Sequence, residues 1–146
     1  ATIYRPLNNF FLNPLMEYLR KKYVCEKQIK KGINGVRESI ECIKKGQSIA
    51  LMIDQRVSEG IKVDFFGKPA LTTSLPAQLA IKFDLPIIPV FIERETNYNY
   101  KIKFFNPIKI FNSENKEEIT KKLNQVLESM ILKNPNEWIW THNRWK

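Results

Sequence analysis

Segments with helical periodicity alternate along this chain with short apolar runs, and this alternation strongly restricts the folds that it can adopt. The predicted helices cover residues 14–22, 35–45, 75–83 and 117–133. The predicted strands cover residues 2–6, 48–53, 63–66, 87–93 and 100–105. Such an order is typical of α/β proteins, so we expect a mixed, mainly parallel sheet flanked by helices.

Residues at the ends of these segments support the assignments. Asn13 is expected to cap the first helix, with Pro14 at its first position, and Ser74 is expected to cap the third. The run 48–53 is almost entirely apolar and predicts a buried strand. Pro89 interrupts the run 87–93, so this strand is expected to bend or to start late.

The chain carries a formal net charge of +9 over 146 residues, a length that suits one domain. A basic surface attracts nucleic acid, anionic lipid headgroups or phosphorylated small molecules, and charge alone does not select among them. The structural alternative is a solvated face without a partner. The sequence contains no G-x-x-x-x-G-K-[ST], G-x-G-x-x-G or G-x-S-x-G motif.

Cysteine and histidine are too few for several kinds of site. Cys25 and Cys42 form neither a C-x-x-C pair nor a disulfide framework, which favours a reducing compartment. His142 is the only histidine, and we expect no metal site and no cofactor. No signal peptide is recognised, and the longest nearly unbroken apolar stretch, residues 85–92, is far too short to cross a bilayer.

Two groups of polar residues lie where α/β proteins bind ligands, beyond the carboxyl ends of strands. Arg5 ends the first predicted strand, and Asp54 and Gln55 end the strand 48–53. The planar guanidinium of Arg5 suits phosphate or carboxylate, since it donates two hydrogen bonds at once. Asp54 has the chemistry to orient a base, to hold Arg5 or to bind a sugar hydroxyl. The structural alternative is an Arg–Asp bridge that only pins loops.

Two aromatic segments also have a structural and a functional interpretation. Phe10, Phe11 and Leu12 precede the first helix, where Leu12 is expected to staple against the first turn; a membrane-facing or acyl-binding role is the alternative. Trp138 and Trp140 in the basic tail are expected to pack in the core, and a position at a water–lipid boundary is the alternative.

Four ordered blocks of this chain, which together run from Tyr4 to Lys146, resemble the lipid A lauroyl and myristoyl acyltransferases. The blocks are Tyr4-Arg5-Pro6 with Asn8-Asn9; Lys45-Gly46, Asp54-Gln55, Gly60 and 63–70 with Thr72-Thr73; Leu79-Ala80, 86–89 and Arg94; and 135–146. Each block is weakly specific alone, but their order and spacing are specific. The resemblance implies a glycerolipid-acyltransferase-like fold.

The resemblance also implies an enzyme that moves a fatty acyl chain from acyl carrier protein to a hydroxyl of a lipid A precursor, in lipopolysaccharide biosynthesis. It implies a location on the cytoplasmic face of the bacterial inner membrane, where the basic surface meets anionic lipid. By position, Arg5 and Asp54 are the expected catalytic residues. The expected substrate-binding residues are Asn8, Asn9, Gln55 and Arg94.

This chain departs from the related acyltransferases at one motif. Those enzymes use a His-x4-Asp/Glu pair, in which the histidine takes the proton of the attacking hydroxyl. His142 is followed by only four residues, so the motif cannot be written in this sequence. In the family the motif lies before the Tyr-Arg-Pro block. We therefore expect residues 1–146 to be the C-terminal part of a single acyltransferase domain, inactive without the segment that carries this motif.

Two other functions stay open from the sequence. A related acyltransferase that acts on another glycolipid or glycerolipid has the same blocks, because acceptor choice depends on loop shape. A non-catalytic basic module that binds nucleic acid is the other. We expect no nucleic-acid partner, because no RRM, KH or zinc-finger signature is present and the basic residues do not gather on one helix between aromatic residues.

Overall fold

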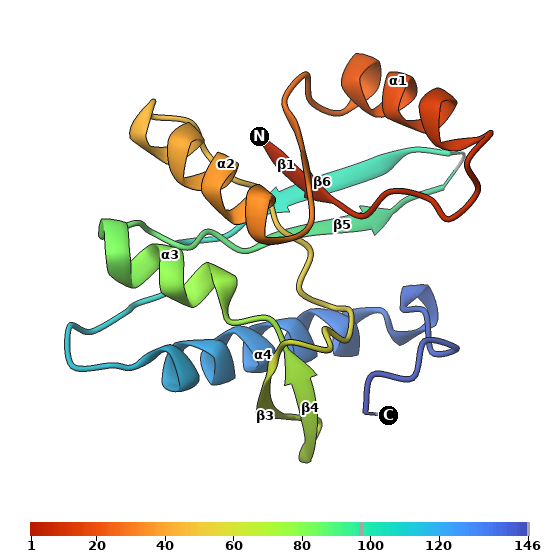
Figure 1. Cartoon of the computed structure of the whole chain (residues 1–146). Helices are drawn as coiled ribbons and strands as arrows, with labels where there is room; N and C mark the ends of the chain where they lie inside the picture. Colours follow the sequence, from red (N-terminus) through yellow and green to blue (C-terminus); the bar gives the residue numbers. More distant parts are fainter. Residues whose placement is uncertain (97, 146) are drawn as a thin grey trace. The chain divides into compact units, whose positions relative to one another are not determined.

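In the computed structural model, which describes residues 1–96 and 98–145, internal contacts divide the chain into two units. Unit 1 is Ala1–Met52 and unit 2 is Ile53–Lys146. Figure 1 shows their elements with the labels used below.

Unit 1 begins with a parallel strand–helix–strand arrangement. Strand β1 (Thr2–Tyr4) pairs with β2 (Gln28–Lys30), and helix α1 (Asn13–Tyr23) connects them. Helix α2 (Ile33–Lys44) then packs on β2 around the buried residues Ile29, Ser39 and Cys42. At Gly35 a side chain is excluded, since an added Cβ would lie 2.1 Å from the carbonyl oxygen of Lys30.

The predicted strand 48–53 is wrong in extent and in burial. Only Ala50 pairs, through one parallel bridge to Thr2, and Met52 is 75% exposed. Backbone hydrogen bonds join Ala50 to Ala1 and Ile3, so the segment does run beside β1. Because β1 is itself only three residues long, it offers too few partners to hold a full third strand.

Unit 2 opens with a hairpin of two antiparallel strands, β3 (Ile61–Phe65) and β4 (Lys68–Thr72). Phe66 and Gly67 form its two-residue turn with φ of 50° and 70°, and a positive φ at both positions matches the right-handed twist of a hairpin. Strand β4 was not predicted, because it contains Pro69. In a two-stranded sheet each strand is an edge, where proline is tolerated.

The helices of unit 2 confirm the periodicity in the sequence. Helix α3 spans Leu75–Phe83 and α4 spans Lys116–Lys133. A capping box starts α4, in which Asn115 accepts from the backbone of Glu118 and the Glu118 side chain accepts from Asn115. Ser74 occupies the N-cap position of α3 as predicted, but its side chain makes no capping bond.

Two clusters of buried residues hold unit 2 together, and α4 contributes to both. One joins Phe65 and Ala70 of the β3–β4 hairpin to Ile131. The other joins Ala77 of α3 to Ile119 and Leu123. Figure 1 shows α4 beside both α3 and the hairpin, which agrees with these contacts.

A second antiparallel hairpin consists of β5 (Val90–Arg94) and β6 (Tyr100–Phe104). Strand β5 starts directly after Pro89, so the expected late start is confirmed. The lysines that alternate along 100–105 predict a half-exposed strand, which is wrong, because four of the five residues of β6 are exposed. After α4, a short 3-10 helix η1 (Pro135–Glu137) leads into the tail.

The predicted fold class is confirmed as mixed α/β, but the mainly parallel sheet is wrong. Among the described residues, β1–β2 is parallel and the pairs β3–β4 and β5–β6 are antiparallel. The physical reason is connection length. A parallel pair needs a crossover of roughly a dozen residues or more, whereas these two hairpins are closed by short turns.

Candidate functional site

Arg5 lies exposed directly after β1, and its neighbour Tyr4 is fixed by a polar network. The Tyr4 hydroxyl donates to Oε1 of Glu17 at 2.7 Å, and Nδ2 of Asn13 donates to the same oxygen at 2.9 Å. Nζ of Lys30 lies 3.3 Å from that oxygen, so the network joins β1, α1 and β2. The backbone that carries Arg5 is therefore held at its strand end.

The same network shifts two pKa values. Hydrogen bonds from Tyr4, then from Asn13, hold the pKa of Glu17 at about 2. Burial, then the hydrogen bond to Glu17, raises the pKa of Tyr4 to about 12. Glu17 is thus ionised and Tyr4 is a neutral donor at neutral pH, which keeps the hydrogen bond between them intact.

The asparagines after Arg5 shape the loop that leads into α1. Asn8 is exposed, and Oδ1 of Asn9 accepts hydrogen bonds from the backbone of Phe11 at 3.0 Å and Leu12 at 3.2 Å. The prediction that Asn13 is the N-cap is wrong, because Asn13 is the first helical residue and Leu12 holds the cap position. The side chain of Asn9, about one turn before Asn13, accepts from the backbone N–H groups of Phe11 and Leu12 instead.

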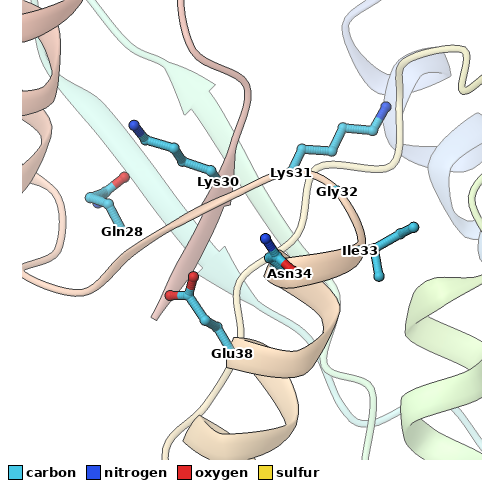
Figure 2. Close-up of a pocket in the computed structure, with 8 residues that line it drawn as sticks. Gln28, Lys30, Lys31, Gly32, Ile33, Asn34 and Glu38 are labelled. Atoms are coloured by element: carbon cyan, nitrogen blue, oxygen red, sulfur yellow. The ribbon is translucent and has the colours of Figure 1, made fainter.

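An open hollow of about 620 Å³ lies between β2 and the start of α2 in unit 1. Figure 2 shows Lys30, Lys31 and Asn34 among the residues around it. The N-terminus of a helix is positively polarised, so the hollow has a positive rim. Glu38 lies on its wall and pairs with Lys27 at 3.0 Å.

In unit 2, Asp54 lies near a buried arginine of the tail. Asp54 is half-buried, and its Oδ1 atom is buried with no hydrogen-bond donor among the described residues. Arg144 is fully buried, donates to the carbonyl of Leu71 and, at 2.8 Å, to the hydroxyl of Thr72, and lies 5.3 Å from the ring centre of Phe65. Burial lowers the pKa of Arg144, and the charge of Asp54 opposes that shift.

A second contact ties the same loop to the same tail. The backbone N–H of Arg56 donates to Nε2 of His142 at 3.3 Å. This bond uses the acceptor nitrogen of the only histidine in the chain. Asp54 and Arg56 on the loop therefore face His142 and Arg144 on the tail.

The other predicted site residues of unit 2 are exposed. Gln55 follows Asp54 on the loop, and Arg94 ends β5, where its backbone N–H donates to Glu137 at 3.5 Å. Arg5, Asn8 and Asn9 belong to unit 1, so their pairing with Asp54 stays a prediction. The structure brings Asp54 together with Arg144, which the sequence analysis did not select. The feature of the sequence that could have indicated Arg144 is its position between aromatic residues of the tail.

The tail explains where the tryptophans lie. Trp138 and Trp145 pack on Phe65, with the Trp145 ring stacked at 5.6 Å and its Nε1 atom donating to the carbonyl of Phe65. Core packing is thus confirmed for Trp138. It is wrong for Trp140, which is exposed because it only edges against Trp138 and donates to the carbonyl of Pro135.

Within residues 1–96 and 98–145, no three side chains of His, Cys, Asp or Glu gather closely enough to hold a metal ion. In the same residues, no helix combines the length and apolar character that crossing a membrane requires.

The model of one family, described as bacterial lipid A biosynthesis acyltransferase, matches residues 1–146. Among curated proteins, the search finds no significant match.

Proposed function

This chain belongs to the bacterial lipid A biosynthesis acyltransferase family, and from that premise we propose that it takes part in moving a fatty acyl chain from acyl carrier protein to a hydroxyl of a lipid A precursor. The observation that carries the proposal is the family match over the whole chain, residues 1–146. The blocks around Arg5, Asp54 and the tail support it.

The proposed reaction exchanges one acyl bond for another. The hydroxyl oxygen of the acceptor attacks the thioester carbonyl carbon, a C–O bond forms, the C–S bond breaks, and the thiolate takes up the proton that the hydroxyl loses. Negative charge develops on the carbonyl oxygen during the attack, so a fixed cation beside that oxygen accelerates the reaction. His142 is not proposed as the base that removes the hydroxyl proton, because its Nε2 atom already accepts a hydrogen bond from the backbone of Arg56. No other described residue is assigned this role.

Arg5 is the proposed cation. Its side chain is exposed, while the adjacent Tyr4 ties the strand end to α1 and β2 through Glu17. A guanidinium on a backbone held in this way can meet either a phosphate of the acceptor or the developing oxyanion with two hydrogen bonds. Asn8 and Asn9, on the loop that follows, are proposed to contact the same substrate.

Asp54 is the proposed carboxylate of the site. Its side chain is half-buried, and as a carboxylate it can accept a hydrogen bond from a sugar hydroxyl. Arg144 supports this role, because its bonds to Leu71 and Thr72 fix its positive charge near Asp54. Gln55 and Arg94 are proposed as further substrate contacts.

The location proposed for the protein is the cytoplasmic face of the bacterial inner membrane, as a peripheral protein. The formal net charge of +9 supports this, because acyl carrier protein, phosphorylated lipid A precursors and the lipid surface are all acidic partners. The same charge favours rapid encounter with each of them at low salt.

The proposal is tested with protein expressed from its complete gene, acyl carrier protein loaded with laurate, and a lipid A precursor. Formation of an acylated precursor is expected. Arg5→Ala is expected to lower kcat by about 100-fold or more, the scale for losing one donor to a developing oxyanion. Arg37→Ala is the matched control, since Arg37 is an exposed arginine of the same unit.

Asp54→Asn, with Asp84→Asn as its exposed control, tests the carboxylate in the same assay. Near-normal turnover by Arg5→Ala and Asp54→Asn would remove both residues from the site. Turnover with another glycolipid or a glycerolipid, and none with the lipid A precursor, would replace the proposed acceptor.

A further inference from the structure

The loop before α1 presents two phenylalanines to solvent. Phe10 is 83% exposed and Phe11 is 88% exposed, and their rings pack edge to face at 5.9 Å. Leu12 and Leu15 beside them are each about half exposed, with fractions of 51% and 53%. Leu12 holds the N-cap position of α1, and its expected staple against the first turn stays a prediction. Single exposed apolar residues are ordinary, but a contiguous group of this kind marks an interaction site.

The backbone holds this group in a defined shape. The N–H of Asn13 donates to the carbonyl of Asn9, and the Asn9 side chain accepts from Phe11 and Leu12. Helical geometry therefore extends back through the turn that precedes α1 in Figure 1. The two rings are presented by a fixed turn, so little conformational entropy is lost when they bind.

Exposed residues continue along one face of α1. Phe11, Leu15, Tyr18 and Lys22 follow one another at i, i+4, i+7 and i+11, and all four are exposed. None of the residues of α1 is fully buried. Lys22 lies over the rings of Tyr18 at 5.7 Å and Tyr23 at 5.2 Å. Along this face, apolar side chains come first, tyrosine follows and lysine comes last. A water–lipid boundary favours this order, because tyrosine has an apolar ring with a polar tip and lysine carries its charge at the end of an apolar stem.

The charge of this segment is basic. Arg20, Lys21 and Lys22 occupy the last turn of α1, and Glu17 is the only acidic residue in 10–24. Glu17 does not pair with these three cations, since it accepts from Tyr4 and Asn13 and pairs with Lys30. The exposed face thus combines apolar rings with cations that no acidic residue of the segment offsets.

We propose that the α1 surface, made of Phe10, Phe11, Leu12, Leu15, Tyr18, Lys21 and Lys22, docks onto a lipid bilayer that carries anionic headgroups. Phe10 and Phe11 enter the apolar region, the tyrosine lies at headgroup depth, and the lysines meet the anionic headgroups. The inference deepens the proposed membrane location by naming the surface that makes the contact. It does not need the proposed acyl transfer, because docking requires neither donor nor acceptor.

The test measures how the protein distributes between buffer and vesicles in the absence of substrates. Vesicles of phosphatidylcholine mixed with phosphatidylglycerol are expected to bind it more tightly than phosphatidylcholine alone. The double variant Phe10→Ser, Phe11→Ser is expected to lower the partition coefficient by about tenfold or more, since two apolar rings no longer enter the bilayer. The single variants are expected to lie between the two.

Phe104→Ser is the matched control, because Phe104 on β6 is also strongly exposed, at 74%. It is expected to bind like the unchanged protein. Far-UV circular dichroism checks that each variant keeps its helices. Unchanged binding by the double variant, or an equal loss in Phe104→Ser, would overturn the proposal.

The charged half of the α1 surface has a control of its own. Lys21→Gln with Lys22→Gln is expected to weaken binding to the anionic vesicles by roughly fivefold for each lysine removed. The pair Lys44→Gln with Lys45→Gln removes two adjacent exposed lysines elsewhere in unit 1 and is expected to have a smaller effect. Binding to purified acyl carrier protein that is lost in the Phe10, Phe11 variant, with no binding to vesicles, would assign the surface to an acidic protein and contradict docking on lipid.

Discussion

At the scale of single residues, Arg144 is the buried cation on which the tail depends. Arg144→Ala removes its bonds to the carbonyl of Leu71 and the hydroxyl of Thr72, together with its contact on Phe65. Both acceptors keep another donor, Val57 for the Leu71 carbonyl and Asn124 for the Thr72 hydroxyl. Each hydrogen bond from a charged group contributes about 1.5–3 kcal/mol, so losing the two bonds is expected to cost about 3 kcal/mol of unfolding free energy. Urea unfolding followed by tryptophan fluorescence measures this, because Trp145 lies on the same ring.

Arg144→Lys separates the charge of Arg144 from its shape. Lysine keeps the positive charge near Asp54 but cannot donate in a planar fork, so most of the loss is expected to remain. Lys121→Ala, an exposed cation on α4, is the control and is expected to change stability little. A midpoint for Arg144→Ala equal to that of the control would show that the tail is held by its tryptophans alone.

Glu17 gives unit 1 a defined pH dependence. Its pKa is about 2 in the folded protein against an ordinary value of 4.5, because Tyr4 and Asn13 donate to it. A depressed pKa means that this contribution to stability is fully present above about pH 4.5 and is lost as the pH falls towards about 2. We expect Glu17→Gln to flatten the stability of the protein in that window, measured by far-UV circular dichroism in urea. Glu26→Gln, at an exposed position, should leave the slope as it is.

The residues that the sequence singled out and those that the structure brings together overlap only partly. Asp54 was predicted from its place after an apolar run, yet its charged neighbour Arg144 lies far along the chain, and no local spacing connects the two. Asn13 carried the residue type of an N-cap but became the first residue of α1, where it donates to Glu17. Only the partner of Asp54 is distant in the sequence, so local spacing does not reveal it. The partner of Asn13 is local, four residues later in the same helix.

At the scale of elements, helices were predictable and strands were less so. Helices α3 and α4 follow apolar stripes that need no knowledge of a distant partner. A strand exists only with its partner, so the apolar run 48–53 made a single bridge, at Ala50. Strand β4 was missed for the opposite reason. Its Pro69 indicated that the segment is not a strand, but the two-residue turn at Phe66 and Gly67 brings it beside β3, which pairs with it.

That turn permits a clean test of backbone strain. Gly67 has φ of 70°, and an added Cβ would meet no atom within 4 Å, so Gly67→Ala changes conformational preference alone. A non-glycine residue in the left-handed region costs about 1–2 kcal/mol, and we expect this loss in urea unfolding. Gly67→Asn is expected to lose less, since asparagine tolerates that region. Equal stability of the glycine and alanine proteins would mean that the turn adopts another conformation.

At the scale of the whole molecule, the two units differ in how each forms a core. The fully buried residues of unit 1 are few, with Ile29 and Cys42 the main apolar ones. In unit 2 both apolar clusters are built only from residues after Met52. The segment 1–146, predicted to be part of a single domain, therefore consists of one unit with a small core and a second unit with a core of its own.

We accordingly expect Ile53–Lys146, expressed alone, to fold cooperatively. The chain has three tryptophans, Trp138, Trp140 and Trp145, and all belong to this unit, so their fluorescence reports its unfolding selectively. Ile119→Ala in this segment is expected to lower its unfolding free energy by about 2–5 kcal/mol, because Ile119 is fully buried between α4 and α3. Leu132→Ala, on the exposed side of α4, is expected to cost far less. A gradual, non-cooperative loss of fluorescence in urea, insensitive to Ile119→Ala, would mean that the clusters of unit 2 need residues 1–52 to pack.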